Sequence, residues 1–213
     1  MRKTLVTAIT LALAGTSLAA SAQSTPATPA AQVADSAAQV TTQLPRTARP
    51  SHYAVQITPH ADKMTFDGKV RIDVQVLEPT QTLVLQAANL TFGTSTLSAG
   101  KGKPLTAKVS TDADAQTASF AFDKTLAPGK YVLSIDYSGI INTQANGLFA
   151  LDYATADGQK RALYTQFENS DARRFIPSWD EPDFKATFDL AVTVPAAQMA
   201  VSNMPIASSK DAG

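Results

Sequence analysis

The clearest pattern in the chain is a strict alternation of apolar and polar positions between residues 64 and 76. Even-numbered positions from Phe66 to Val76 carry apolar residues or glycine, and the odd-numbered positions between them carry charged or polar residues. A period of two residues is typical of a β-strand with one face in the core and the other in solvent. The pattern therefore predicts a half-buried strand over residues 64–76.

Shorter segments of the same kind follow along the chain. They predict further strands at residues 82–86, 91–97, 104–109, 118–122, 130–137, 147–153 and 161–168. Turn-forming pairs separate several of them, such as Pro128-Gly129, Asn146-Gly147 and Asp157-Gly158. Many short strands at this spacing predict an all-β sandwich or saddle.

The strand predicted at residues 161–168 ends in two polar side chains, Gln166 and Glu168, that are candidates for binding a ligand. Successive side chains of a strand point to opposite faces, so Gln166 and Glu168 share a face with Tyr164, whereas Thr165 and Phe167 share the other. A carboxylate and a carboxamide are therefore expected to project side by side from the end of the strand. Such a pair can hold a cation.

A helical turn and a corner are predicted after this strand. Asn169, Ser170 or Asp171 can cap a short helix, because their side-chain oxygens accept hydrogen bonds from its first backbone amides. Pro177 and Pro182 disfavour helical geometry at the residue before each, so residues 175–183 are expected to form an irregular corner. Alternation over residues 184–194 then predicts a half-buried strand, whose apolar face would carry Phe188, Leu190, Val192 and Val194.

The first 22 residues predict a secretory signal peptide cleaved after Ala22. Arg2 and Lys3 precede an apolar run over residues 5–14, and the small residues ASA end at the cleavage site. The apolar run is too short to span a bilayer, which needs about 20 residues. We therefore expect an exported protein, periplasmic or extracellular, without a stable membrane anchor after cleavage.

Amino-acid composition predicts a linker and argues against several kinds of partner and metal site. Residues 23–43 consist mainly of Ala, Thr, Ser, Pro and Gln and predict a low-complexity linker. Removal of Arg2 and Lys3 leaves 16 basic against 18 acidic side chains, and this near-neutral balance points to no nucleic acid or acidic membrane as partner. The chain has no cysteine, which excludes disulfides and a cysteine-based metal site.

The segment TQFENSDARRFIPSWDEPDFKATFDL, residues 165–190, closely resembles the end of the N-terminal domain of M1-family zinc aminopeptidases. In that family a TQFE-like strand runs into a DARR-like turn and a DEP-like corner followed by FKATF. Weaker similarity covers LPRTARPSHYAVQITP (44–59), FDGKVRIDVQV (66–76) and VSNMP (201–205), the last of which resembles a late strand of the domain. The resemblance implies an antiparallel, saddle-like β-sandwich with one short helical turn over residues 44–213.

The resemblance also implies an activity for the full-length protein, the removal of N-terminal residues from peptides with a free N-terminus. In the family, the Gln and Glu of the TQFE-like strand reach the active site of the following domain. Carried over, Glu168 would accept the substrate's α-ammonium group and Gln166 would line the pocket for the first side chain.

The catalytic metal is expected outside this chain. The family's zinc site is an H-E-x-x-H helix, which places two histidines on one face. This chain has only His52 and His60, without that motif, and His52 is expected to be structural. We therefore expect the chain to stop before its catalytic domain, which would be its partner. By itself the chain is expected to bind no zinc and to cleave nothing.

Other interpretations of these residues stay open. Glu168 could be a surface residue paired with Arg173 or Arg174. The protein could be a non-catalytic secreted β module that binds a partner with the face carrying Gln166 and Glu168. It could also be a relative of the M1 peptidases that acts on a non-peptide substrate such as an epoxide. Glu rather than Gln at position 168 favours recognition of an amine.

Most other charged residues of the motif are expected to act locally. Ion pairs and hydrogen bonds must hold the corner if Glu168 is to point correctly, and the residues expected to provide them are Asp171, Arg173, Arg174, Asp180 and Glu181. Trp179 is expected to pack beneath the corner.

Overall fold

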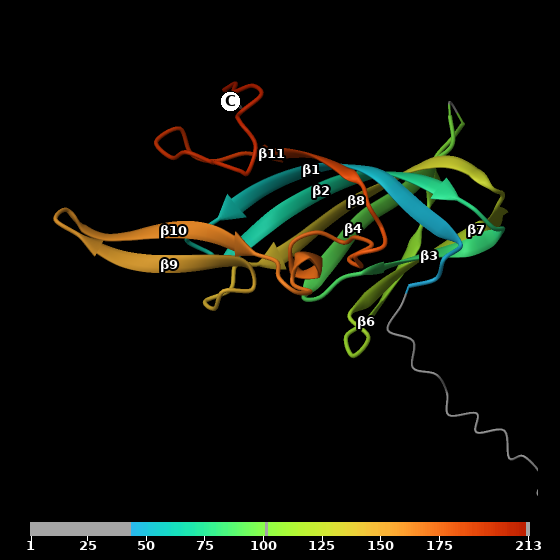
Figure 1. Ribbon diagram of the computed structural model, residues 1–213, viewed down its shortest axis with the longest axis horizontal. Coiled ribbons are helices and arrows are strands. Elements are labelled where there is room, and N and C mark those ends of the chain that lie inside the picture. The colour runs from blue at the N-terminus through green and yellow to red at the C-terminus, as the bar shows by residue number, and fades with distance from the viewer. Residues whose placement is uncertain (1–43, 101, 212–213) are drawn as a thin grey trace, which may run out of the picture. The chain divides into compact units, whose positions relative to one another are not determined.

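The computed structural model of the chain describes residues 44–100 and 102–211 (Figure 1). Its regular elements are eleven strands and one short 3-10 helix, so the predicted all-β class is confirmed for the described residues. No helix among them is long and apolar enough to cross a bilayer. The predicted signal peptide at residues 1–22 and the predicted linker at residues 23–43 lie outside this range, and both stay predictions.

The largest sheet has six strands in the order β11-β1-β2-β8-β4-β5. Its strands are β1 (Ala48–His60), β2 (Thr65–Val76), β4 (Leu90–Ser98), β5 (Leu105–Thr106), β8 (Gly129–Ile140) and β11 (Thr187–Val192). All neighbours run antiparallel except β1 and β11, which run parallel. β11 lies at one edge of this sheet. Because it runs parallel to β1, the two strands cannot be joined by a tight hairpin.

Two smaller sheets complete the described part. The order β3-β7-β6 forms a three-stranded antiparallel sheet from β3 (Thr80–Gln86), β6 (Lys108–Asp112) and β7 (Thr117–Leu126). β9 (Gly147–Thr155) and β10 (Gly158–Gln166) form a separate antiparallel hairpin, which extends away from the other strands in Figure 1.

The hydrophobic core lies between the six-stranded and the three-stranded sheets. β2 alternates between buried and exposed positions as its sequence predicts. Phe92 of β4 and Phe120 of β7 meet edge to face, with ring centroids 5.5 Å apart. The two sheets therefore share one core and form the predicted sandwich.

Gly68 explains how β2 and β8 accommodate a large aromatic side chain. It pairs with Tyr137 of β8, and the Tyr137 ring fills the space that a β-carbon at position 68 would take. The Tyr137 hydroxyl donates a hydrogen bond of 3.0 Å to the carbonyl oxygen of Phe175. A glycine in the sheet thus allows a tyrosine to connect the core with the corner that follows η1.

Most predicted strands are confirmed with small shifts of their ends, but one is wrong. The single strand predicted at residues 104–109 is divided between β5 in the large sheet and β6 in the three-stranded sheet. Between them, the backbone amide of Ala107 donates to the carbonyl oxygen of Ser95 at 2.9 Å. A short β-rich segment carries no signal for a change of sheet. The strand predicted at residues 161–168 also ends earlier, at Gln166.

The strand predicted at residues 184–194 is present as the shorter β11, but its predicted burial is wrong. Its apolar residues share the core face of the sheet, because they pair with buried Tyr53, Val55 and Ile57 of β1. They are nevertheless 57%, 45% and 37% exposed at Phe188, Leu190 and Val192. The Phe188 ring stacks on that of Tyr53, 4.7 Å away, and the row is otherwise largely open to solvent. Residues 193–211, which include VSNMP, form no strand.

The predicted helical turn is the 3-10 helix η1 (Ala172–Arg174). Asp171 occupies its N-cap position but makes no side-chain capping hydrogen bond, so the predicted capping role is wrong. Its carboxylate instead accepts a hydrogen bond of 2.7 Å from Nε of Arg174. Residues 175–183 form the predicted irregular corner.

Candidate functional site

Gln166 is placed by the root of the β9–β10 hairpin. It is the last residue of β10 and pairs with Gly147, the first residue of β9. Gly147 has φ of +63°, which favours glycine, and a β-carbon there would lie 2.8 Å from Cβ of Arg174. The root of the hairpin therefore packs directly on η1.

Glu168 lies two residues beyond the end of β10. Its side chain and that of Gln166 are both exposed, and Oε1 of Gln166 accepts a hydrogen bond of 3.2 Å from the backbone amide of Glu168. The carboxamide thus contacts the backbone that carries the carboxylate. The two residues lie together at the end of the hairpin, although Glu168 itself is outside the strand.

The Glu168 carboxylate has no ion-pair partner among the residues that the structure describes. The two arginines considered as partners are engaged elsewhere. Nε of Arg173 lies 2.9 Å from Oδ2 of Asp180, and Nε of Arg174 lies 2.7 Å from Oδ1 of Asp171. The interpretation of Glu168 as half of a surface ion pair with these arginines is not what the structure shows.

Phe167 anchors the backbone between the two candidate residues. Its ring lies 5.3 Å from that of Phe175, whose ring in turn lies 5.7 Å from that of fully buried Phe66. The carbonyl oxygen of Phe167 accepts a hydrogen bond of 3.0 Å from the backbone amide of Asp171. Since Phe167 packs on the core, the adjacent side chains of Gln166 and Glu168 are left on the surface.

The corner after η1 is attached to the end of β3 through Gln86. Backbone groups of Gln86 and Ser178 exchange hydrogen bonds of 2.9 and 3.1 Å. The Gln86 side chain, which is 3% exposed, accepts from the backbone amide of Asp180 at 2.8 Å and donates to Oε1 of Glu181 at 3.1 Å. Oε2 of Glu181 lies 3.2 Å from a terminal nitrogen of Arg46. Asp180 and Glu181 thus hold the corner locally, in agreement with the sequence-based expectation.

Two buried tyrosines hold the corner from below. The Tyr53 hydroxyl accepts a hydrogen bond of 3.1 Å from the backbone amide of Trp179, and Tyr137 donates to Phe175 as described above. Burial raises the pKa of both hydroxyls well above their ordinary value, so both are neutral at physiological pH. Trp179 is 4% exposed and packs beneath the corner as expected.

Neither histidine belongs to a metal-binding cluster. His52 contacts the Thr187 hydroxyl at 2.7 Å and the Asp189 carboxylate at 3.3 Å, and His60 lies 2.9 Å from Asp67. Within residues 44–100 and 102–211, no three His, Cys, Asp or Glu side chains gather closely enough to hold a metal ion. The described residues therefore do not fit a zinc site.

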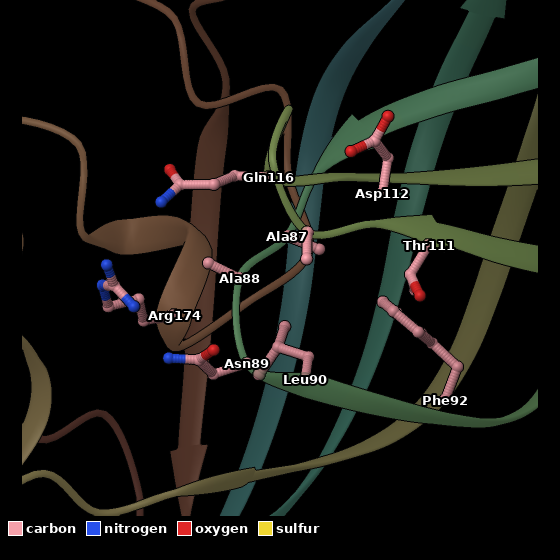
Figure 2. A pocket seen from close by; sticks show the side chains of 10 residues that line it. Ala87, Ala88, Asn89, Leu90, Phe92, Thr111, Asp112, Gln116 and Arg174 are labelled. Atoms are coloured by element: carbon pink, nitrogen blue, oxygen red, sulfur yellow. The ribbon is translucent and has the colours of Figure 1, made fainter.

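Two hollows of the described surface lie near the hairpin and η1, and neither is lined by the candidate residues. One, of about 230 Å³, lies beside η1 and is lined by the β3–β4 connection, the β6–β7 turn and Arg174 (Figure 2). The other, of about 670 Å³, is an open groove between the turn after β1, the hairpin and residues near Pro195. Gln166 and Glu168 instead stand on an open surface.

Comparison with known proteins decides the family. The model of the peptidase M1 N-terminal domain matches residues 49–213. The chain belongs to this family. Aminopeptidase N of Acetobacter pasteurianus is 41% identical over 172 residues, which are 80% of this chain and 47% of that protein. The predicted resemblance to M1 peptidases is therefore confirmed.

Plant proteins show the same similarity over the same part of the chain. Aminopeptidase M1-C of Oryza sativa subsp. japonica is 38% identical over 80% of this chain and 19% of its own length. Aminopeptidase M1 of Arabidopsis thaliana is 35% identical over 78% of this chain and 20% of its own length. This M1 N-terminal domain thus spans about half of the bacterial relative and about a fifth of the plant relatives.

Sequence reasoning missed the residues that position the site. The sequence pattern places Phe167 only on the strand face opposite Gln166, and it places Gln86 only at the end of a strand. The only signals were that Phe167 lies between the two polar candidates and that Gln86 ends an apolar strand. Both act through contacts with residues distant in the sequence, which no local pattern reveals.

Proposed function

We propose that this M1 N-terminal domain anchors the free N-terminus of a peptide in an exported zinc aminopeptidase whose catalytic domain lies in the remainder of the polypeptide. The observation that carries the proposal is that the Glu168 carboxylate is exposed and unpaired among the described residues. Glu168 lies at the root of the hairpin and follows a phenylalanine packed on the core. The similarity to proteins named aminopeptidase supports the same function.

The chemistry of such a site follows from charge. A carboxylate accepts hydrogen bonds from an α-ammonium group, and a charge-assisted hydrogen bond is roughly twice as strong as a neutral one. A blocked or internal peptide bond offers no ammonium group and would leave the carboxylate unpaired. Glu168 would therefore select free N-termini, while Gln166 would line the pocket for the first side chain.

Zinc would be held outside the residues described here, since these do not fit a zinc site. The metal would supply an activated water for attack on the peptide bond. This chain would contribute the anchor and one wall of the cleft. Purified residues 23–213 are accordingly expected to show no chelator-sensitive aminopeptidase activity, and such activity in that preparation would contradict this division of labour.

The experiment that tests the function uses the polypeptide expressed to the natural end of its coding sequence. The assay compares a chromogenic aminoacyl substrate with its N-acetylated form, with and without chelator, in the wild type, in Glu168→Ala and in Glu78→Ala. Glu78 is a matched control, because it is also an exposed glutamate. Glu168→Ala is expected to lower kcat/KM for the free-amine substrate by about 10- to 100-fold, the loss of a hydrogen bond between charged groups.

The possible results separate this function from its alternatives. A fall in kcat/KM confined to Glu168→Ala and to the free-amine substrate supports amine anchoring. Equal kcat/KM values for Glu168→Ala and Glu78→Ala would show that Glu168 does not bind the substrate's amine. Absence of chelator-sensitive activity in the wild type would instead favour a binding module or a relative acting on a non-peptide substrate.

A further inference from the structure

The hollow beside η1 combines an apolar lining with several polar side chains (Figure 2). Its apolar lining includes Leu90 and Phe92 of β4 and Ala87, which follows β3. Its volume of about 230 Å³ is smaller than the roughly 300–1,000 Å³ of pockets that bind drug-sized molecules. The hollow therefore suits a ligand about as large as a single amino acid.

Arg174 brings hydrogen-bond donors to this hollow that no described residue uses. Its side chain is only 23% exposed, and its Nε donates to Oδ1 of Asp171 at 2.7 Å. Its two terminal nitrogens donate to no acceptor among the residues that the structure describes. These nitrogens form a planar fork, which matches the two oxygens of a carboxylate.

The carboxamides of Asn89 and Gln116 lie on the same side of the hollow as the Arg174 guanidinium (Figure 2). Oε1 of Gln116 accepts a hydrogen bond of 3.3 Å from a terminal nitrogen of Arg173, which leaves the NH₂ group of Gln116 as a donor. The Asn89 side chain has no hydrogen-bond partner among the described residues. Asn89 and Gln116 have φ of +57° and +53°, a conformation that is uncommon outside glycine and clusters at ligand sites.

Asp112 places a carboxylate on the other side of the hollow (Figure 2). One of its oxygens accepts a hydrogen bond of 2.9 Å from the backbone amide of Ala115. Arg174 is already paired with Asp171, so no described cation balances the charge of Asp112. This charge repels a simple anion but attracts an ammonium group. The hollow therefore favours a small ligand that carries both a carboxylate and an ammonium group.

We propose that this hollow binds a free α-amino acid. The amino acid's carboxylate binds Arg174 and the carboxamides of Asn89 and Gln116, its ammonium group lies on the side of Asp112, and its side chain contacts Leu90. An internal residue of a peptide has neither charged group and a terminal residue has only one, so the hollow selects free amino acids over peptides. Neither candidate residue for the α-ammonium group of a peptide lines this hollow, so the site is separate from the proposed anchor.

Equilibrium dialysis with radiolabelled L-leucine tests the inference in the polypeptide expressed to the natural end of its coding sequence. Gln116→Glu keeps the oxygen that Arg173 contacts but replaces the donor NH₂ group with a second carboxylate oxygen. Asn89→Asp makes the same exchange, and aspartate tolerates the left-handed backbone of this position. The control Gln56→Glu makes the exchange at an exposed position of β1 that does not line the hollow. Thermal unfolding checks that each variant is folded.

Gln116→Glu and Asn89→Asp are each expected to weaken leucine binding in the hollow at least about tenfold, because each places a like charge beside the ligand's carboxylate. Gln56→Glu and Glu168→Ala are expected to retain this binding. Isocaproate, which is leucine without its amino group, is expected to compete at least about tenfold more weakly than leucine, since Asp112 then repels the ligand.

Several outcomes would overturn the inference. They are an absence of leucine binding at up to about 10 mM, binding that neither variant of the hollow weakens, and equal competition by isocaproate. Binding that is lost in Glu168→Ala but kept in Gln116→Glu would also overturn it, and would support the proposed function instead. Leucine binding that depends on Gln116 and Asn89 in a protein without aminopeptidase activity would support the inference and contradict only the proposed function.

Discussion

Oδ2 of Asp180 lies 2.9 Å from Nε of Arg173, and both side chains are only 15% exposed. The Arg173 backbone amide also approaches this oxygen, at 3.4 Å, and one terminal guanidinium nitrogen donates to the carbonyl oxygen of Asp180 at 3.3 Å. The pair connects η1 with the far side of the corner. It therefore sets the path of the backbone that leaves Glu168, although neither residue lies at the candidate site.

Removal of one partner of this pair is expected to destabilise the fold strongly. Asp180→Ala leaves the Arg173 guanidinium largely buried without its carboxylate, and the free energy of unfolding should fall by about 3 kcal/mol. Urea denaturation of residues 44–213, followed through the fluorescence of Trp179, measures the change. The double variant Arg173→Met, Asp180→Leu should recover a part of the loss. If Asp180→Ala lowers the free energy of unfolding by less than about 0.5 kcal/mol, the pair contributes no more than an exposed ion pair, and the prediction is wrong.

A methyl group added at Gly68 is expected to disrupt the sheet. The Tyr137 ring fills the position of the added β-carbon in Gly68→Ala, so the substitution should cost at least about 1–3 kcal/mol through overpacking. The control is Gly129→Ala, where the nearest side-chain atom would lie 3.7 Å from the new β-carbon, an ordinary contact. Thermal unfolding of the two variants should separate them clearly. Equal melting temperatures would mean that Tyr137 can move away at little cost.

Gly68 also shows how far the sequence predicts this fold. The alternation over residues 64–76 was sufficient to assign the strand and its buried face, since period-two patterns report burial directly. It gave no reason for a glycine on that face, because the reason is a tyrosine almost seventy residues away. The same limit explains the division of residues 104–109 between two sheets, which depends on long-range pairing.

At the candidate site, too, the sequence identifies some residues from their neighbours, whereas others are identified only by their tertiary contacts. Gln166 and Glu168 are recognisable from the residues around them, and so is the irregular corner with its two prolines. The contacts of Phe167 with Phe175 and of Gln86 with Asp180 and Glu181 are not, because they join segments that only the tertiary fold brings together. The exposure of β11 was also missed, since alternation identifies an apolar face but not whether another element covers it.

The ion pair between Asp152 and Arg161 predicts a pH-dependent attachment of the hairpin. Hydrogen bonds from the Arg161 guanidinium hold the pKa of the Asp152 carboxyl below its ordinary value. A carboxyl whose pKa is lowered on folding stabilises the protein at neutral pH, and this contribution is lost as the pH falls through the folded-state pKa. Asp152→Asn should therefore lower the urea midpoint at neutral pH, and this difference should disappear once the pH has fallen below the folded-state pKa of Asp152.

The matched control for this pH effect is Asp123→Asn, which removes an ion pair between side chains that are more than four-fifths exposed. Its effect on the midpoint is expected to be smaller at neutral pH, because such pairs contribute little. The two hairpin residues are themselves on the surface, so the difference is modest and needs paired measurements. A midpoint difference for Asp152→Asn that persists in acid would assign the effect to packing rather than to charge.

The uncovered apolar face of β11 predicts self-association of the chain when it is studied alone. Phe188, Leu190 and Val192 form an exposed apolar row on an edge strand, a combination that favours pairing with other chains. Purified residues 44–213 should bind a hydrophobic dye and form concentration-dependent assemblies in analytical ultracentrifugation. Leu190→Lys should reduce both with a stability change within about 0.5 kcal/mol, since the side chain is exposed. Leu77→Lys, at equal exposure but outside the row, should reduce neither. A monomeric wild type without dye binding would mean that the row is covered in solution, and the prediction would fail.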